Sequence, residues 1–123
     1  MTVAHCCARD VPFDLLRRAG FKAVSVDTQL LGQAADDALG AWWDRGGVVV
    51  LGVAPSLEDP RMRPEHLARR VGGLWGRIGF GMGDVGQRTW LSPACGLASA
   101  SPTWAREVGA LLRGAARMLE SSE

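Results

Sequence analysis

The sequence has little net charge and no long apolar run. Its 14 basic and 13 acidic residues give a formal net charge of +1. Proteins that bind nucleic acid or an anionic membrane surface usually have a basic excess, so this balance argues against both kinds of partner. No segment reaches the ~20 apolar residues of a membrane-spanning helix. The N-terminus also lacks the charged segment and apolar run of a secretory signal. We therefore expect a cytoplasmic protein that binds neither nucleic acid nor membranes.

Cysteine is also scarce, with three residues in a chain of 123. Three thiols cannot all pair within one chain, and a reducing cytosol disfavours disulfides. Metal binding or a buried thiol is therefore the better expectation. The length fits one domain of ordinary size with enough apolar residues for a core.

Four short β-branched or apolar runs alternate with four helical patterns. The predicted strands span residues 2–6, 23–27, 48–53 and 88–91, and the predicted helices span 13–19, 30–44, 64–78 and 102–118, with Ser101 as the N-cap of the last. This alternation indicates βα units around a parallel sheet. Four units are half of an eight-unit barrel. We predict an α/β fold in which residues 1–123 form one partial-barrel domain, the C-terminal half of a TIM-type (β/α)8 barrel.

Four candidate metal ligands lie at the ends of predicted strands. Side chains alternate along a strand, so His5 and Cys7 share one face while Cys6 points to the other. Asp27 ends the second strand, and Cys95 follows the fourth. The C-terminal ends of parallel strands share one rim, where sites are usually built. One imidazole, two thiols and one carboxylate form a ligand set that zinc accepts in tetrahedral geometry.

The charge of this set indicates what such a site would do. Two thiolates and one carboxylate around a divalent ion leave a net charge of −1, and an added thiolate would make it −2. That excess keeps the incoming sulfur electron-rich, while the metal removes its proton. Taken singly, each residue has a simpler interpretation: a hydrogen-bonded histidine, buried thiols, or a helix-capping Asp27. Their joint position at strand ends favours a zinc site that activates a thiol.

Two sequence segments resemble a known family. His5-Cys6-Cys7 and the run Leu91-Ser92-Pro93-Ala94-Cys95-Gly96-Leu97 resemble the H-x-C and C-G-L segments of cobalamin-independent methionine synthases, above all the short actinobacterial and archaeal-type members. The segment 99–106 is similar to the start of their final helix. The resemblance covers essentially the whole chain, as roughly the last third of a family member.

This resemblance implies methyl transfer from a methyltetrahydrofolate to homocysteine, with the thiol bound to zinc on a TIM-type barrel. It places His5, Cys7 and Cys95 on zinc ligands and Asp27 near a carboxylate ligand, which is Glu in the long enzymes. The long enzymes also carry a proton-transferring His after the third of these strands. Here Ala54-Pro55-Ser56 follows instead, so the proton donor is unassigned. The half-barrel that supplies most substrate contacts in the family is not part of this chain. We therefore expect self-association or a separate N-terminal half-barrel.

Two alternative functions remain. The first is a corrinoid-linked thiol methyltransferase of the uroporphyrinogen-decarboxylase superfamily, whose members share an H-x-C and a later zinc-binding Cys; the methyl donor distinguishes these enzymes from methionine synthases. The second is a truncated zinc-binding remnant without catalytic activity.

Three minor patterns receive structural interpretations. The run 81–86 matches G-x-G-x-x-G but follows a helix and precedes a strand, so we predict a flexible loop there. Asp36 and Asp37 are expected on a solvated face. The inner face of the strands is expected to include Val3, Val24, Val26 and Val49 or its neighbours.

Overall fold

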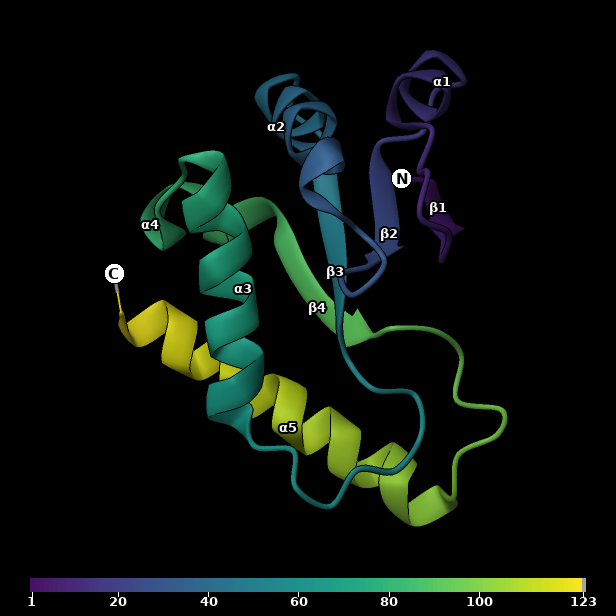
Figure 1. The fold of residues 1–123 in the computed structure, drawn as a ribbon, viewed down its shortest axis with the longest axis vertical. Coiled ribbons are helices and arrows are strands. Elements are labelled where there is room, and N and C mark those ends of the chain that lie inside the picture. Colours follow the sequence, from purple (N-terminus) through teal and green to yellow (C-terminus); the bar gives the residue numbers. More distant parts are fainter. Residues whose placement is uncertain (123) are drawn as a thin grey trace.

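The computed structural model describes residues 1–122 as one parallel sheet with helices between successive strands (Figure 1). The strands are β1 (Val3–Cys6), β2 (Ala23–Asp27), β3 (Val48–Ala54) and β4 (Thr89–Pro93). The helices are α1 (Phe13–Arg18), η1 (Gln33–Ala35), α2 (Asp36–Asp44), α3 (Pro64–Ile78), α4 (Met82–Val85), η2 (Gly86–Arg88) and α5 (Pro102–Ser121). The predicted α/β class and its four parallel strands are confirmed. None of the helices among these residues is long and apolar enough to cross a bilayer.

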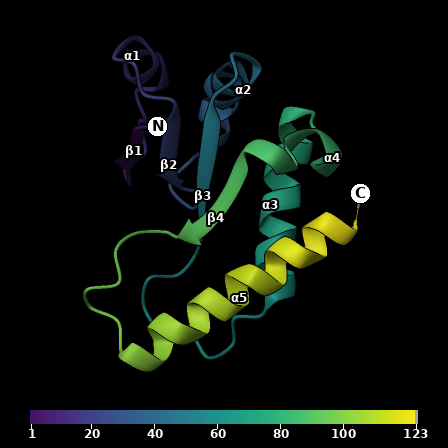
Figure 2. The same cartoon turned by 180° about the vertical axis from the view of Figure 1, so that it is seen from behind.

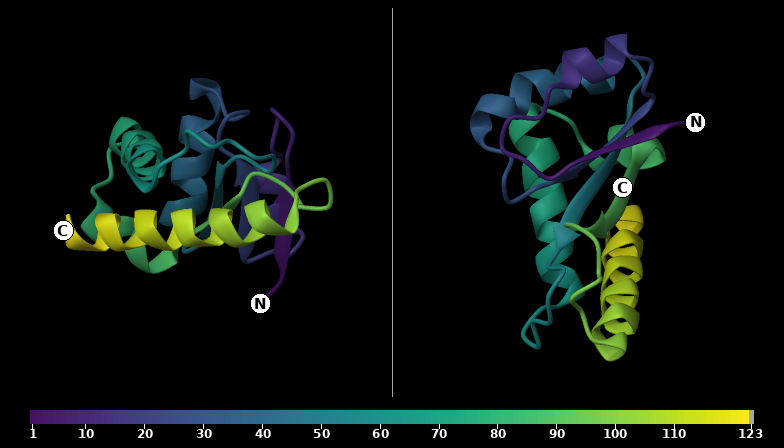
Figure 3. Two further views of the ribbon diagram at one scale, coloured as in Figure 1. Left: turned by 90° about the horizontal axis from the view of Figure 1, so that it is seen from below. Right: turned by 90° about the vertical axis from the view of Figure 1, so that its right-hand side faces the viewer.

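The strands lie in sequence order, β1-β2-β3-β4, and every neighbouring pair is parallel. The register aligns Ala4 with Val24 and Val24 with Val49, so these three side chains share one face of the sheet. Val24 and Val49 have no exposed surface. The helices cover this face: α1 packs against α2, α2 against α3, and α3 against α5. Figures 2 and 3 show α5 alongside α3 and next to β4.

The opposite face of the sheet, called the open face below, is exposed at its two edge strands, β1 and β4. His5 aligns with Ser25, Ser25 with Val50, and Val50 with Trp90, so these side chains share that face. Val3 is 45% exposed and Trp90 is 47% exposed. The expected inner face was therefore wrong for Val24 and Val26, which lie on the face opposite to that of His5 and pack beneath the helices. Val3 does lie on the open face, and so does Val50, the neighbour of Val49.

Four tryptophans are buried in the helix layer. Trp42, Trp43, Trp75 and Trp104 are each less than 5% exposed. The ring centroids of Trp43 and Trp75 are 5.2 Å apart. The guanidinium carbon of Arg88 lies 3.7 Å from the centroid of the Trp43 ring. Arg88 also donates hydrogen bonds to the carbonyls of Trp43 and Gly47, which ties η2 to the end of α2.

Two segments differ from the sequence prediction. The helix predicted from residue 30 begins as η1, and α2 starts at Asp36. The amides of Leu30 and Leu31 are held by the Asp27 carbonyl, and Gly32 is extended, so a regular helix cannot start earlier. The predicted loop at 81–86 was also wrong, because α4 and η2 form there. The Asp84 carboxylate accepts a hydrogen bond from the Gly81 amide, and the fully buried Val85 anchors the turn.

Candidate metal centre

Three side chains of ligand type meet at the C-terminal rim of the sheet. His5 lies on β1, Cys7 follows it directly, and Cys95 lies in the loop after β4. Their ligand atoms all lie within 4.8 Å of one another, and the Sγ atoms of Cys7 and Cys95 are 4.0 Å apart. All three side chains are exposed. The structure therefore brings together three of the four residues predicted from the sequence.

The meeting of Cys7 and Cys95 requires the chain to cross the sheet. In a flat sheet β1 and β4 would be three strand spacings apart, ~14 Å. The loop after β4 closes this distance by turning back towards the β1 side (Figure 1). It passes over β3 at Gly52, where an added Cβ atom would lie 2.8 Å from the Cα of Ala94 and 2.7 Å from the carbonyl oxygen of Val26. Both of these are backbone atoms that cannot rotate away. Glycine at position 52 thus permits the crossing.

Two further contacts fix the backbone of Cys95. The Ser56 Oγ atom accepts a hydrogen bond from the Cys95 amide at 2.9 Å and donates one to the Cys95 carbonyl at 3.2 Å. The Ala94 amide donates to the carbonyl of Ala54, the last residue of β3, at 2.8 Å. The loop that carries Cys95 is therefore held by β3 and the residues that follow it, even though the cysteine itself is exposed.

The His5 ring has a hydrogen-bond partner on the neighbouring strand. Its Nδ1 atom lies 3.0 Å from Ser25 Oγ, as expected for two residues that face each other in the β1–β2 register. A metal-binding histidine usually uses its second ring nitrogen in such a contact, which sets the tautomer and the ring orientation. With Nδ1 engaged by Ser25, Nε2 is the nitrogen available to a metal.

Asp27 lies outside this cluster. Its Oδ1 atom accepts a hydrogen bond from the Gln29 amide at 2.9 Å, in the turn that leads towards η1. This is an Asx-turn contact and not the helix cap that the sequence allowed as an alternative, because η1 begins only at Gln33. Ligation by Asp27 stays a prediction, since its other carboxylate oxygen is not engaged by this bond.

The donor set fits zinc. Two thiolates on one tetrahedral zinc ion, each at ~2.3 Å, lie ~3.8 Å apart. The observed Sγ–Sγ distance of 4.0 Å is close to that value. The hydrogen bond and charge of Cys95 raise the pKa of the Cys7 thiol above its ordinary value. The two sulfurs thus oppose joint ionisation, which a divalent cation between them would favour.

Two further residues of ligand type, Cys6 and His66, have other surroundings. Cys6 is half-buried and, by strand alternation, faces away from His5. His66 lies in the first turn of α3, where its Nδ1 atom accepts a hydrogen bond from the Arg63 amide. Neither belongs to the cluster.

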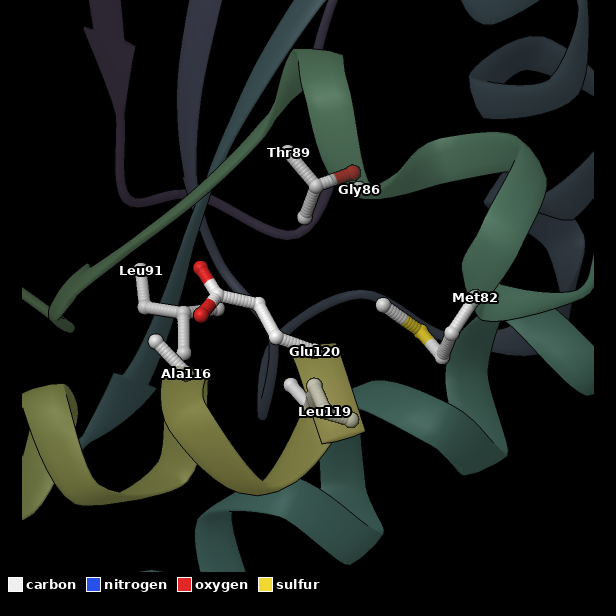
Figure 4. Close-up of a pocket in the computed structure, with 7 residues that line it drawn as sticks. All are labelled: Met82, Gly86, Thr89, Leu91, Ala116, Leu119 and Glu120. Atoms are coloured by element: carbon white, nitrogen blue, oxygen red, sulfur yellow. The ribbon is translucent and has the colours of Figure 1, made fainter. Parts of the chain in front are cut away.

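A cavity of about 60 Å³ lies elsewhere, between α4, β4 and α5 (Figure 4). It is lined by Met82, Thr89, Leu91 and Leu119, among others, and the buried Thr89 hydroxyl has no hydrogen-bond partner. Thr89 begins β4, whereas the cluster lies beyond the end of that strand. The cavity is therefore separate from the cluster of His5, Cys7 and Cys95.

No protein-family model matches the chain, and the comparison with curated proteins finds no match.

Proposed function

We propose that His5, Cys7 and Cys95 bind one zinc ion and that this centre activates a thiol for methyl transfer. The observation that carries the proposal is the exposed cluster of one imidazole and two thiols. Structural zinc sites usually supply four protein ligands and are closed, whereas catalytic sites supply three and leave a position for substrate. An exposed set of three matches the second kind.

The chain's own residues would favour a thiolate at the open position. Zinc, when bound, supplies the positive charge that removes a thiol proton near neutral pH. The thiolates of Cys7 and Cys95 cancel that charge, so an added thiolate keeps its negative charge and its nucleophilicity. Ser25 orients His5, and Ser56 holds Cys95, so both ligands are placed before the thiol arrives. Ligation by Asp27 would add one more negative charge.

The substrates follow from the resemblance of the H-x-C and C-G-L segments to cobalamin-independent methionine synthases. We propose homocysteine as the acceptor and a methyltetrahydrofolate as the donor. A cytoplasmic location suits this chemistry, because thiols stay reduced there. The open face of the sheet would be covered by four further parallel strands, from a second copy or from a separate half-barrel.

Cobalt-substituted protein tests the acceptor. Homocysteine added to the Co²⁺ form should strengthen the sulfur-to-cobalt charge-transfer absorption in the near ultraviolet, and homoserine should not. Cys7→Ser should weaken the absorption before any thiol is added. If homocysteine leaves the wild-type spectrum unchanged, the centre binds metal without accepting a thiol, and the methyltransferase proposal is wrong.

The donor is tested by the same protein supplied with homocysteine and either methyltetrahydrofolate or methylcobalamin. We expect little or no methionine from residues 1–123 alone, because the proposal places most substrate contacts on a second half-barrel. With that half supplied, the proposal expects methionine from methyltetrahydrofolate only. Transfer from methylcobalamin alone would instead support a corrinoid-linked methyltransferase.

A further inference from the structure

We propose that Cys7 and Cys95 form a reversible disulfide under oxidising conditions, which makes the centre a redox-sensitive metal site. The disulfide depends only on the geometry of the two thiols. The accompanying release of zinc rests on the proposed function.

The geometry favours this pair. The two sulfurs are 4.0 Å apart and no residue separates them, since each is the other's hydrogen-bond partner. A disulfide bond is ~2.05 Å long, so ~2 Å remains to be closed. Both side chains are exposed, and Cys7 lies outside β1, so rotation about their Cα–Cβ bonds meets little resistance. Exposure also gives a small oxidant access to either sulfur.

The third cysteine is adjacent in sequence but differs in position. Cys6 is the last residue of β1 and is half-buried on the helix side of the sheet. Strand alternation directs its side chain away from the face that carries His5. Cys6 is therefore an internal control: it has the same chemistry and almost the same place in the sequence, but no path to Cys95.

A peroxide supplies the oxidising equivalents. One thiolate attacks a peroxide oxygen, the O–O bond breaks, and a sulfenic acid and hydroxide form. The second thiolate attacks the sulfenic sulfur, the S–S bond forms, and the S–O bond breaks with loss of a second hydroxide. Two protons convert both hydroxides to water, so one hydrogen peroxide is consumed per disulfide. A zinc ion held by these thiolates loses two of its ligands and is released.

Peptide mapping of metal-free protein tests the disulfide. After treatment with hydrogen peroxide and trypsin, the peptide 1–9, which carries Cys6 and Cys7, should be joined to the peptide 89–106, which carries Cys95. The free thiols should fall from three to one. Cys6→Ser should leave the joined peptide unchanged, and Cys7→Ser should abolish it. Dithiothreitol should restore all three thiols.

The zinc-loaded protein provides the second readout. Peroxide should release one zinc ion, measured with a chromogenic chelator, for each joined peptide, and Cys6→Ser should behave as the wild type. The proposal is overturned if the main product joins Cys6 to Cys7, links two chains, or is a sulfinic acid. Joined peptides from a protein that never binds zinc would sustain the disulfide and contradict only the metal site.

Discussion

The arrangement of the candidate ligands His5, Cys7 and Cys95 depends on a few single residues. His5 and Cys7 come to one face because side chains alternate along β1, and Ser25 then holds the His5 ring from β2. Ser56 holds Cys95 through both of its backbone polar groups. Ligands held in this way lose less freedom when an ion binds.

Removing the Ser25 hydroxyl should weaken metal binding without removing a ligand. Loss of an outer contact to a metal-binding histidine typically reduces affinity by ~10–100-fold. We expect Ser25→Ala to lie in this range and Ser25→Thr, which keeps the hydroxyl, to lie nearer to the wild type. Competition with a zinc chelator measures both. Equal affinity of Ser25→Ala and the wild type would show that Ser25 does not orient His5.

The sequence predicted the candidate ligands that local rules bring together, and it missed the supporting residues whose positions depend on the path of the chain. Alternation along one strand and the common rim of parallel strands were enough to group His5, Cys7 and Cys95. The contact of Ser25 with His5 depends on the β1–β2 register. That register could have been predicted by aligning the ends of the two parallel strands. Ser56 and Gly52 depend on where the loop after β4 crosses, and no local pattern specifies that crossing.

At the level of elements, the loop after β4 crosses over β3 and brings Cys95 to Cys7, which follows the opposite edge strand, β1. Gly52→Ala should displace this loop, because the new methyl group meets backbone atoms of Val26 and Ala94. We expect a loss of ~1–3 kcal/mol in unfolding free energy, as for other overpacked sites, together with weaker zinc binding. Urea unfolding and chelator competition measure the two effects.

Gly73→Ala, in α3, is the matched control. No atom lies within 4 Å of its added Cβ, and alanine favours a helix interior over glycine by ~1 kcal/mol. This variant should be at least as stable as the wild type and should bind zinc equally well. If Gly52→Ala behaves in the same way, the loop does not depend on a glycine at the crossing.

An ion pair connects α2 to α3. The Arg77 Nε and Nη2 atoms donate to the two Asp36 oxygens at 2.6 and 2.9 Å, so the expectation that Asp36 is merely solvated was wrong. This hydrogen bonding holds the pKa of Asp36 below its ordinary value. Because the folded pKa is depressed, the stabilisation is complete above the unfolded pKa of ~3.9 and is lost as the pH falls through the folded value.

Asp36→Asn should therefore lower the unfolding free energy of metal-free protein by up to ~1 kcal/mol at pH 7, a value limited by solvent screening of the half-exposed arginine. The difference from wild type should shrink as the pH falls below ~4. Asp37→Asn, beside it and exposed, should change stability much less. A wild-type advantage that is independent of pH would show that the charge of Asp36 is not responsible.

Across the whole molecule, the alternation of strands and helices was sufficient to predict the parallel sheet and its strand order. This alternation did not predict which face of the sheet each valine would occupy, because the face depends on the phase of every strand relative to its neighbours. The result is a sheet with one covered face, one open face, and two edges, β1 and β4, that have no neighbouring strand among residues 1–122.

Open parallel edges and exposed apolar side chains favour association. Two copies related by a two-fold axis would pair β1 of each with β4 of the other and form eight parallel strands, the number at which side chains fill a barrel. We expect a dimer or larger species in sedimentation velocity at micromolar concentration, and less association for Trp90→Glu. A well-folded wild-type monomer would rule out closure by a second copy.

Metal analysis of the purified protein is the most direct test of the proposed centre. After dialysis against metal-free buffer, the wild type should retain about one zinc ion per chain, since its ligands come from one polypeptide. His5→Ala, Cys7→Ser and Cys95→Ser should each lose most of it, and Cys6→Ser should retain it. A wild type without zinc after reconstitution, or a Cys6→Ser variant as depleted as Cys7→Ser, would contradict the assignment of this site.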